Sequence, residues 1–211
     1  MFRRLSYSVP RSADRGGVRS LERPIPPVPL RSVAHLYSSR PRRETEPIMI
    51  AAHGVSRMRA SVIGGGTVTD EQAARAEAVG RELAARGHVV VCGGRDGTMA
   101  AVCRGATSED GTTIGILPGE RRGAANDDVD IPIATGLGHA RNALVPLNGD
   151  VVIALAGGVG TLSEIGFAGI YDRPVVGLGT HDLSALEIDI ETADTPTAAV
   201  DAAEAALERP R

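Results

Sequence analysis

The segment DVVIALAGGVGTLSEIGFAGIYDRPVVGLG, residues 150–179, contains one complete strand–helix–strand pattern. Its two apolar runs consist of consecutive aliphatic residues, which is typical of strands covered on both faces of a parallel sheet. A glycine cluster and a helix-length stretch, TLSEIGFAGIYDR, separate the two runs. Parallel strands require such a crossover connection, usually a helix. The segment therefore predicts a βαβ unit.

The same alternation extends over most of the chain. Strand-like runs occupy residues 60–66, 88–94, 113–119 and 131–135, and helix-like stretches occupy residues 69–87, 98–111, 138–150 and 195–208. Thr69 and Gln72 have the spacing of a capping box, Gly87 stands at a stop position, and Thr195 or Thr197 begins the last helix. Strands that alternate with helices pair in parallel through right-handed crossovers. We predict a doubly wound, mostly parallel, Rossmann-like α/β domain of three layers (α/β/α) over residues 58–211.

Residues 1–57 differ sharply in charge from the remainder. They hold 11 arginines and 4 acidic residues, whereas residues 58–211 hold 12 arginines and 22 acidic residues. The first segment is rich in Arg, Ser and Pro and lacks periodicity, so it cannot bury enough apolar surface to offset the entropy of ordering. Three interpretations stay open: a disordered basic leader, a transit peptide, or a mis-called start, with Met49 or Met58 as the true first residue.

Composition excludes several classes of protein. The chain has no lysine, and no apolar run reaches the roughly 18 residues of a membrane span. The acidic balance of residues 58–211 argues against nucleic-acid binding, which needs clustered positive charge. Cys92 and Cys103 form neither a C-x-x-C motif nor a disulfide framework, and we expect small buried side chains in a reducing compartment. These features predict a soluble, cytoplasmic protein with an acidic, halophile-like surface.

Three of the predicted strands end in glycine clusters. The carboxyl ends of parallel strands share one edge of a sheet, where ligands of such folds bind. Glycine lets the backbone approach a ligand closely, and the helix N-terminus that follows favours an anion. We therefore predict a phosphate site that is formed by Gly64, Gly65, Gly66, Gly93, Gly94, Gly97, Gly157, Gly158 and Gly160.

Several phosphate-bearing cofactors are disfavoured. The first turn reads GGGTVT rather than G-x-G-x-x-G, and no acid ends the second strand, so both marks of an NAD site are missing. A P-loop and a pyridoxal phosphate Schiff base each need a lysine, which the chain does not contain. His139, the one histidine near these motifs, has no Cys or carboxylate partners at metal-ligand spacing, and we predict no metal site.

At this point the motifs resemble a known family. GGVGTLSEI, residues 157–165, is similar to the P-G-G-x-G-T-x-x-E signature of the LOG-like Rossmann superfamily, whose members were long labelled lysine decarboxylases. CGGRDGTMAAVCRGA, residues 92–106, resembles the second glycine motif of that superfamily. The GHARN sequence within residues 116–145 is similar to the G-x-x-x-A-R-N segment of its molybdenum-cofactor-carrier-like branch.

The resemblance implies two different functions. LOG enzymes are phosphoribohydrolases that split the N-glycosidic bond of a nucleoside 5′-monophosphate with an Arg-Lys pair and the Glu of the signature. Arg141 matches the Arg and Glu164 the Glu, whereas Asn142 stands in place of the Lys and Ala156 in place of the usual Pro. The missing charge at Asn142 favours the carrier-like branch, in which the role is binding rather than turnover.

Several candidate residues also have a structural interpretation. Thr161 and Glu164 have capping-box spacing, so Glu164 either caps a helix or faces the ligand. Arg141 either binds the ligand phosphate or forms an ion pair with Glu164 or Asp150. Of the residues after the second glycine turn, we expect Thr98 to contact the ligand. Arg121 and Arg122 lie in a long loop that suggests a lid, with a solvated charge cluster as the alternative.

We therefore predict a nucleotide- or phosphate-binding protein of the carrier-like type. Its ligand is the molybdenum cofactor or a nucleoside monophosphate, bound without a covalent link. The alternatives are a phosphoribohydrolase, in which Glu164 and Arg141 are catalytic, and a nucleotide-sensing regulatory protein. By resemblance, we also expect a homo-oligomer, either a dimer or a tetramer.

Overall fold

The computed structural model describes residues 57–183 and 188–209. The prediction of a leader over residues 1–57 lies, apart from Arg57, outside the described residues. The elements in chain order are β1 (Arg59–Ile63), α1 (Asp70–Ala85), β2 (Val89–Cys92), α2 (Thr98–Thr107), β3 (Thr112–Leu117), the 3-10 turn η2 (Arg122–Ala124), β4 (Ile131–Ala134), the 3-10 segment η3 (Gly138–Ala143), α3 (Leu144–Leu147), β5 (Val151–Leu155), α4 (Val159–Ile170), β6 (Val175–Leu178), β7 (Ile190–Thr192) and α5 (Pro196–Glu208).

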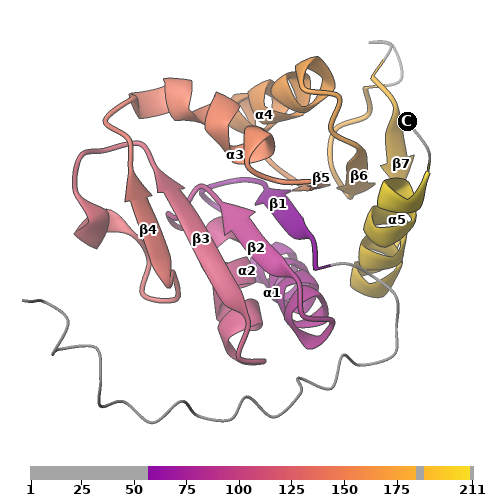
Figure 1. Ribbon diagram of the computed structural model, residues 1–211, viewed down its shortest axis with the longest axis horizontal. Coiled ribbons are helices and arrows are strands. Elements are labelled where there is room, and N and C mark those ends of the chain that lie inside the picture. Colours follow the sequence, from indigo (N-terminus) through magenta and orange to yellow (C-terminus); the bar gives the residue numbers. More distant parts are fainter. Residues whose placement is uncertain (1–56, 184–187, 210–211) are drawn as a thin grey trace, which may run out of the picture. The chain divides into compact units, whose positions relative to one another are not determined.

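The described strands form one parallel sheet with the order β4-β3-β2-β1-β5-β6-β7 (Figure 1). Every neighbouring pair is parallel, and Ala60 of β1 faces Val90 of β2 on one side and Val151 of β5 on the other. The predicted doubly wound α/β fold is confirmed. The edge strand β7 was not predicted, because its three residues, Ile-Glu-Thr, carry no continuous apolar run.

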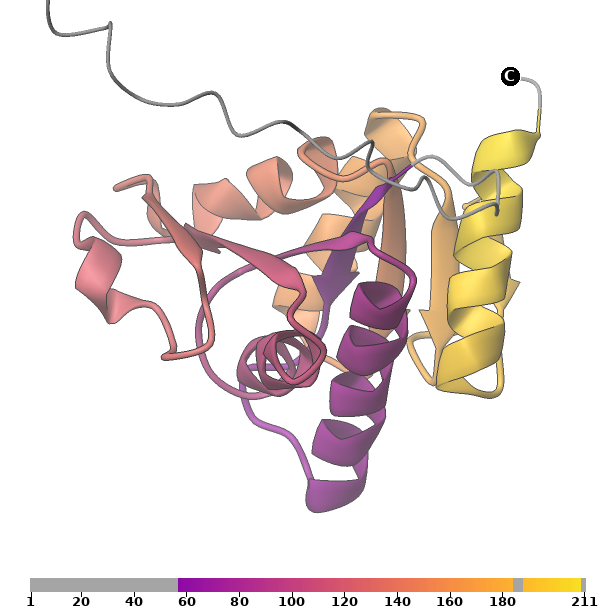
Figure 2. The same ribbon diagram turned by 60° about the horizontal axis from the view of Figure 1, so that its bottom comes forward.

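Helices cover both faces of the sheet, and the strand residues alternate between two apolar cores. On one face, Val62 of β1 and Ile153 of β5 pack with residues of α1, α2 and α5. Figure 2 shows these three helices along one side of the sheet. On the other face, Ile63 and Val152 pack with Val145 of α3 and residues of α4. This two-sided burial explains why the strands are continuous aliphatic runs rather than alternating ones.

The capping predictions for the first and last helices are confirmed. The Thr69 hydroxyl accepts from the N–H of Gln72 at 3.2 Å, and the Gln72 side chain accepts from the N–H of Thr69 at 3.0 Å. Gly87 follows α1 with a φ of +79°, a left-handed conformation that favours glycine at a helix end. The Thr195 hydroxyl caps α5 by accepting from the N–H of Ala198.

The prediction of a single helix over residues 138–150 is wrong. The segment forms η3 and then the single turn of α3, which ends at Leu147. Gly138 has a φ of +55°, and Pro146 has no N–H to donate to a preceding carbonyl, so neither residue supports a regular α-helix. The irregular segment places the side chains of Arg141 and Asn142 against α4.

Cys92 at the end of β2 and Cys103 on α2 are both buried and free, as predicted. Their Sγ atoms lie 3.5 Å apart. Among the described residues, no helix is long and apolar enough to cross a membrane. The same residues contain no group of three or more His, Cys, Asp or Glu side chains arranged to hold a metal ion.

Candidate functional site

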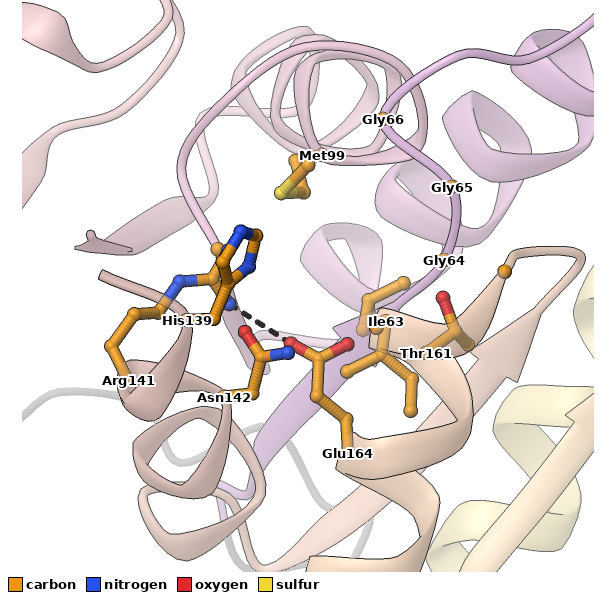
Figure 3. A pocket seen from close by; sticks show the side chains of 14 residues that line it. Ile63, Gly64, Gly65, Gly66, Met99, His139, Arg141, Asn142, Thr161 and Glu164 are labelled. Atoms are coloured by element: carbon orange, nitrogen blue, oxygen red, sulfur yellow. Dashed lines mark hydrogen bonds and ion pairs between the residues drawn. The ribbon is translucent and has the colours of Figure 1, made fainter. Parts of the chain in front are cut away.

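A cavity of about 280 Å³ opens at the carboxyl ends of β1, β2 and β5 (Figure 3). Strands β1 and β5 are neighbours, and the chain continues from them to opposite sides of the sheet order. This is the switch point at which doubly wound sheets bind ligands. The lining residues are Val62, Ile63, Gly64, Gly65, Gly66, Gly93, Met99, His139, Arg141, Asn142, Gly158, Gly160, Thr161 and Glu164.

One wall of the cavity is the first turn of α4. Its N-cap is Gly158, which has no side chain to bond the free N–H groups of that turn. Gly160 and Thr161 lie in the same turn and also line the cavity. Next to them is the loop Gly64–Gly66, where the N–H of Gly65 donates to the carbonyl of Ala156 at 2.9 Å. The helix end therefore presents a positive dipole and glycine backbone to the cavity.

The capping-box interpretation of Thr161 and Glu164 is wrong. The helix begins at Val159, so Thr161 is its third residue and Glu164 lies in its second turn. Thr161 packs instead against Gly157, where a Cβ would collide with the Thr161 hydroxyl. Glu164 is 6% exposed and directs its carboxylate to the cavity (Figure 3). Glu164 therefore lines the cavity and does not cap the helix, and its contact with a ligand stays a prediction.

Arg141 and Glu164 form a buried ion pair inside the cavity. Nη1 of Arg141 donates to Oε1 of Glu164 at 2.9 Å, and the dashed line in Figure 3 marks this bond. Burial raises the pKa of Glu164 from 4.5 to about 7, although the Arg141 guanidinium acts to lower it. The Nε atom of Arg141 is buried and has no hydrogen-bond partner. One edge of the guanidinium is therefore left for another acceptor.

The backbone of Gly93 lies close against this arginine. A Cβ on Gly93 would lie 2.5 Å from Nη2 of Arg141 and 2.6 Å from Sδ of Met99. Any other residue at this position would displace one of the two side chains. Glycine after β2 thus leaves room for the side-chain ends of Arg141 and Met99 in the positions observed.

Asn142 connects η3 to the first turn of α4. Its Nδ2 donates to Oγ of Ser163 at 3.0 Å, and that hydroxyl donates to the carbonyl of Gly160 at 2.6 Å. Asn142 is 8% exposed and lines the cavity. The amide therefore supports the helix end instead of adding a charge to the cavity.

Four residues of the predicted phosphate site lie outside the cavity lining: Gly94, Gly97, Thr98 and Gly157. Thr98 is buried, and a Cβ on Gly64 would collide with its hydroxyl. The N–H of Thr98 donates to the carbonyl of Gly65 at 2.9 Å. The structure therefore does not bring Thr98 to the ligand side, and its role is to hold the first glycine loop. Arg121 and Arg122 are exposed and do not line the cavity, so the lid stays a prediction.

Sequence reasoning missed Val62, Ile63 and Met99 as lining residues, and assigned His139 no ligand role. Val62 and Ile63 belong to a core strand, and Met99 has the pattern of a buried helix residue. His139 lies two residues before Arg141 in η3. Residues at that separation in a helix do not share a face, so no local signal indicated that both line the cavity.

The solved structures of two molybdenum cofactor proteins share this fold. The molybdenum cofactor binding protein from Rippkaea orientalis is 35% identical, with a TM-score of 0.67 over 72% of this chain and 98% of that one. The molybdenum cofactor carrier protein from Chlamydomonas reinhardtii is 32% identical, with a TM-score of 0.66 over 73% of this chain and 100% of that one.

Curated sequences give a second comparison. An uncharacterized protein of Archaeoglobus fulgidus is 42% identical over 111 residues, which are 53% of this chain and 73% of that protein. A cytokinin riboside 5′-monophosphate phosphoribohydrolase of Mycobacterium tuberculosis is 36% identical over 107 residues, 46% of this chain and 57% of that enzyme. The model of the SLOG cluster4 family matches residues 57–207.

Proposed function

The chain belongs to the SLOG cluster4 family of LOG-like proteins, and from this premise we propose that it holds a phosphorylated heterocyclic ligand in the cavity at the β1–β5 switch point. The molybdenum cofactor, whose pterin carries a phosphate, is the proposed ligand, and a nucleoside 5′-monophosphate is the alternative one. The observation that carries the proposal is that one cavity is lined both by Arg141, whose Nε is buried and unpartnered, and by the N-terminus of α4, which has no side-chain cap.

The phosphate is proposed to bind at the first turn of α4. Gly158 and Gly160 leave that turn open, and the Thr161 hydroxyl adds a donor beside the helix N–H groups. Arg141 supplies the charge, since Nε and Nη2 lie along one edge of the guanidinium and only Nη1 bonds Glu164. The donor set fits a phosphate ester, which accepts several hydrogen bonds and carries negative charge.

Glu164 has a defined task in such a complex. When Arg141 turns to a phosphate, the carboxylate loses part of its counter-charge and faces an anion. Its raised pKa of about 7 lets it take up a proton and become neutral. A neutral carboxyl group then donates a hydrogen bond, which suits a ribose hydroxyl or a pterin carbonyl.

Binding rather than turnover is proposed because of Asn142. In the LOG enzymes that the motifs resemble, a lysine follows the arginine, and this chain has an amide that bonds Ser163 instead. The cavity of about 280 Å³ lies just below the usual range of ligand sites, which runs from about 300 to 1,000 Å³, so we propose that it holds one small phosphate ester.

The phosphoribohydrolase alternative has one specific observation in its favour. Glu164 lies in the cavity beside Arg141, and its pKa of about 7 is close to neutral pH. An acid of that strength can stabilise the oxocarbenium-like charge of glycosidic cleavage or transfer a proton to the leaving base. The similarity to the mycobacterial enzyme is consistent with that chemistry.

Chromatography and binding together test the proposal. The full chain and its Arg141→Met, Glu164→Gln and Arg122→Met variants are each incubated with AMP, and binding of inorganic phosphate is measured by calorimetry. Inorganic phosphate should bind the wild type and the exposed-residue control Arg122→Met, and it should bind Arg141→Met at least about tenfold more weakly. AMP should stay intact in the incubations with the wild type and the variants. Release of adenine and ribose 5-phosphate by the wild type but not by Glu164→Gln would establish the hydrolase instead. Absence of any phosphate binding would reject both.

A homo-oligomer is also proposed, through the outer side of α4. Val159 is 83% exposed, Leu162 36% and Ile170 72%, and these residues follow helical spacing along one strip. Light scattering of wild type and Ile170→Asp tests this: a dimer or tetramer that the variant converts to monomer is expected, and a monomeric wild type would reject it.

A further inference from the structure

The cavity has two chemically different ends. At one end, the N-terminus of α4 presents the backbone of Gly158 and Gly160 and the hydroxyl of Thr161, and these groups suit an anion. In Figure 3, Met99, His139 and the Arg141 guanidinium lie on the side of the cavity away from Thr161, and Glu164 lies between the two ends. Such a division is the usual plan of a site for a molecule with one charged and one flat, weakly polar part.

His139 and Met99 are suited to hold a flat ring. Among the lining residues of the described structure, His139 is the only one with a ring side chain. It is exposed, lies in η3, and is followed two residues later by Arg141. Met99 is 9% exposed and reaches the cavity from α2 next to Gly93. A thioether makes favourable contacts with aromatic rings, and an imidazole stacks on a base.

Resting on the proposed function, we propose that His139 stacks on the heterocycle of the ligand, with Met99 against the same ring, and that His139 sets the preference for a ring-bearing ligand over a bare sugar phosphate. The phosphate is held at Thr161 in either case. The ligand class is therefore a phosphate ester of a nitrogen heterocycle, with the ring at the η3 end of the cavity.

The preference can be measured with two probes that differ only in the ring. Ribose 5-phosphate has none, and formycin 5′-monophosphate carries a purine-like ring through a carbon–carbon bond that glycosidic hydrolysis cannot break. Calorimetry with the full chain gives the ratio of the two dissociation constants. Stacking of one base on an aromatic side chain changes affinity by roughly tenfold or more, so the wild type should prefer the ring-bearing probe by at least that factor.

Three variants complete the experiment. His139→Ala should bring the ratio close to one while ribose 5-phosphate binds as before, and His139→Phe, which keeps a flat ring, should retain the preference. Leu137→Ala is the matched control, because Leu137 is 52% exposed in the same loop and does not line the cavity. Urea unfolding confirms that each variant folds.

The outcomes separate the two proposals. A ratio that His139→Ala leaves unchanged, or that His139→Phe reduces as strongly as His139→Ala does, overturns the stacking role of His139. A wild type that binds both probes equally also overturns it, while the phosphate site stands. A wild type that binds neither probe overturns the proposed function together with this inference.

Discussion

Arg141 and Glu164 share one hydrogen bond of 2.9 Å in a pair whose side chains are only 10% and 8% exposed. The two side chains respond differently when the partner is removed. Glu164 can be neutralised by a proton, since its pKa is already near 7, whereas an arginine stays charged at all working pH values. Leaving Arg141 without its partner should therefore destabilise the fold more than leaving Glu164 without its partner.

This asymmetry predicts different stabilities for two matched variants. Glu164→Met leaves a buried guanidinium unpaired and should lower the free energy of unfolding by about 3–5 kcal/mol at pH 7. Arg141→Met leaves a carboxyl group that takes up a proton and should cost only about 1–2 kcal/mol. Urea unfolding of both variants measures this, and equal losses, or a larger loss for Arg141→Met, would contradict the asymmetry.

Stability should depend on pH through Glu164. Its pKa in the folded chain, about 7, lies above the ordinary value of 4.5, so the folded state keeps a proton that the unfolded state releases. The stabilising contribution is complete below pH 4.5 and is lost as pH rises through 7. Glu164→Gln has no such proton. The free energy of unfolding of this variant should therefore improve relative to wild type by about 3 kcal/mol between pH 4.5 and pH 8. A constant difference between the two proteins would show that Glu164 does not titrate in this range.

Asn142→Lys should increase the affinity for phosphate. The new ammonium group lies beside the first turn of α4, and the loss of the bond to Ser163 affects only the support of that turn. At low ionic strength we expect about 3- to 10-fold tighter binding, and less at high salt because screening weakens the added charge. Asn148→Lys is the control with the same charge change, since Asn148 is exposed and does not line the cavity. Equal gains in both variants would mean that only net charge matters.

Two glycines in helices should respond in opposite ways to alanine. A Cβ on Gly105 of α2 would collide with the backbone carbonyl of Glu77 in α1, whereas a Cβ on Gly166 of α4 meets no atom within 4 Å. Gly105→Ala should lower the free energy of unfolding by about 2–3 kcal/mol through overpacking. Gly166→Ala should raise it by about 0.5–1 kcal/mol, since alanine favours the helix. Thermal and urea unfolding measure both, and a neutral Gly105→Ala would show that the helices can separate without cost.

The sheet could be predicted because its signals are local. Strands such as Val151–Leu155 are continuous aliphatic runs, and a chain segment needs only its own residues to indicate burial on both faces. Capping at Thr69 and Thr195 is likewise a matter of residues three positions apart. The strand β7 and the short turns of η3 and α3 lacked such signals, and their conformation depends on the elements against which they pack.

The candidate site was predicted in part. The sequence by itself determined the glycine clusters after β1, β2 and β5 and their convergence on one edge, because the carboxyl ends of parallel strands lie together. Only the tertiary structure decided that Arg141 meets Glu164 across 23 positions of sequence, that Thr98 lies beneath Gly64, and that His139 faces the cavity. The physical reason is that packing between elements distant in sequence determines the neighbours of a side chain. Local residue patterns contain no information about that packing.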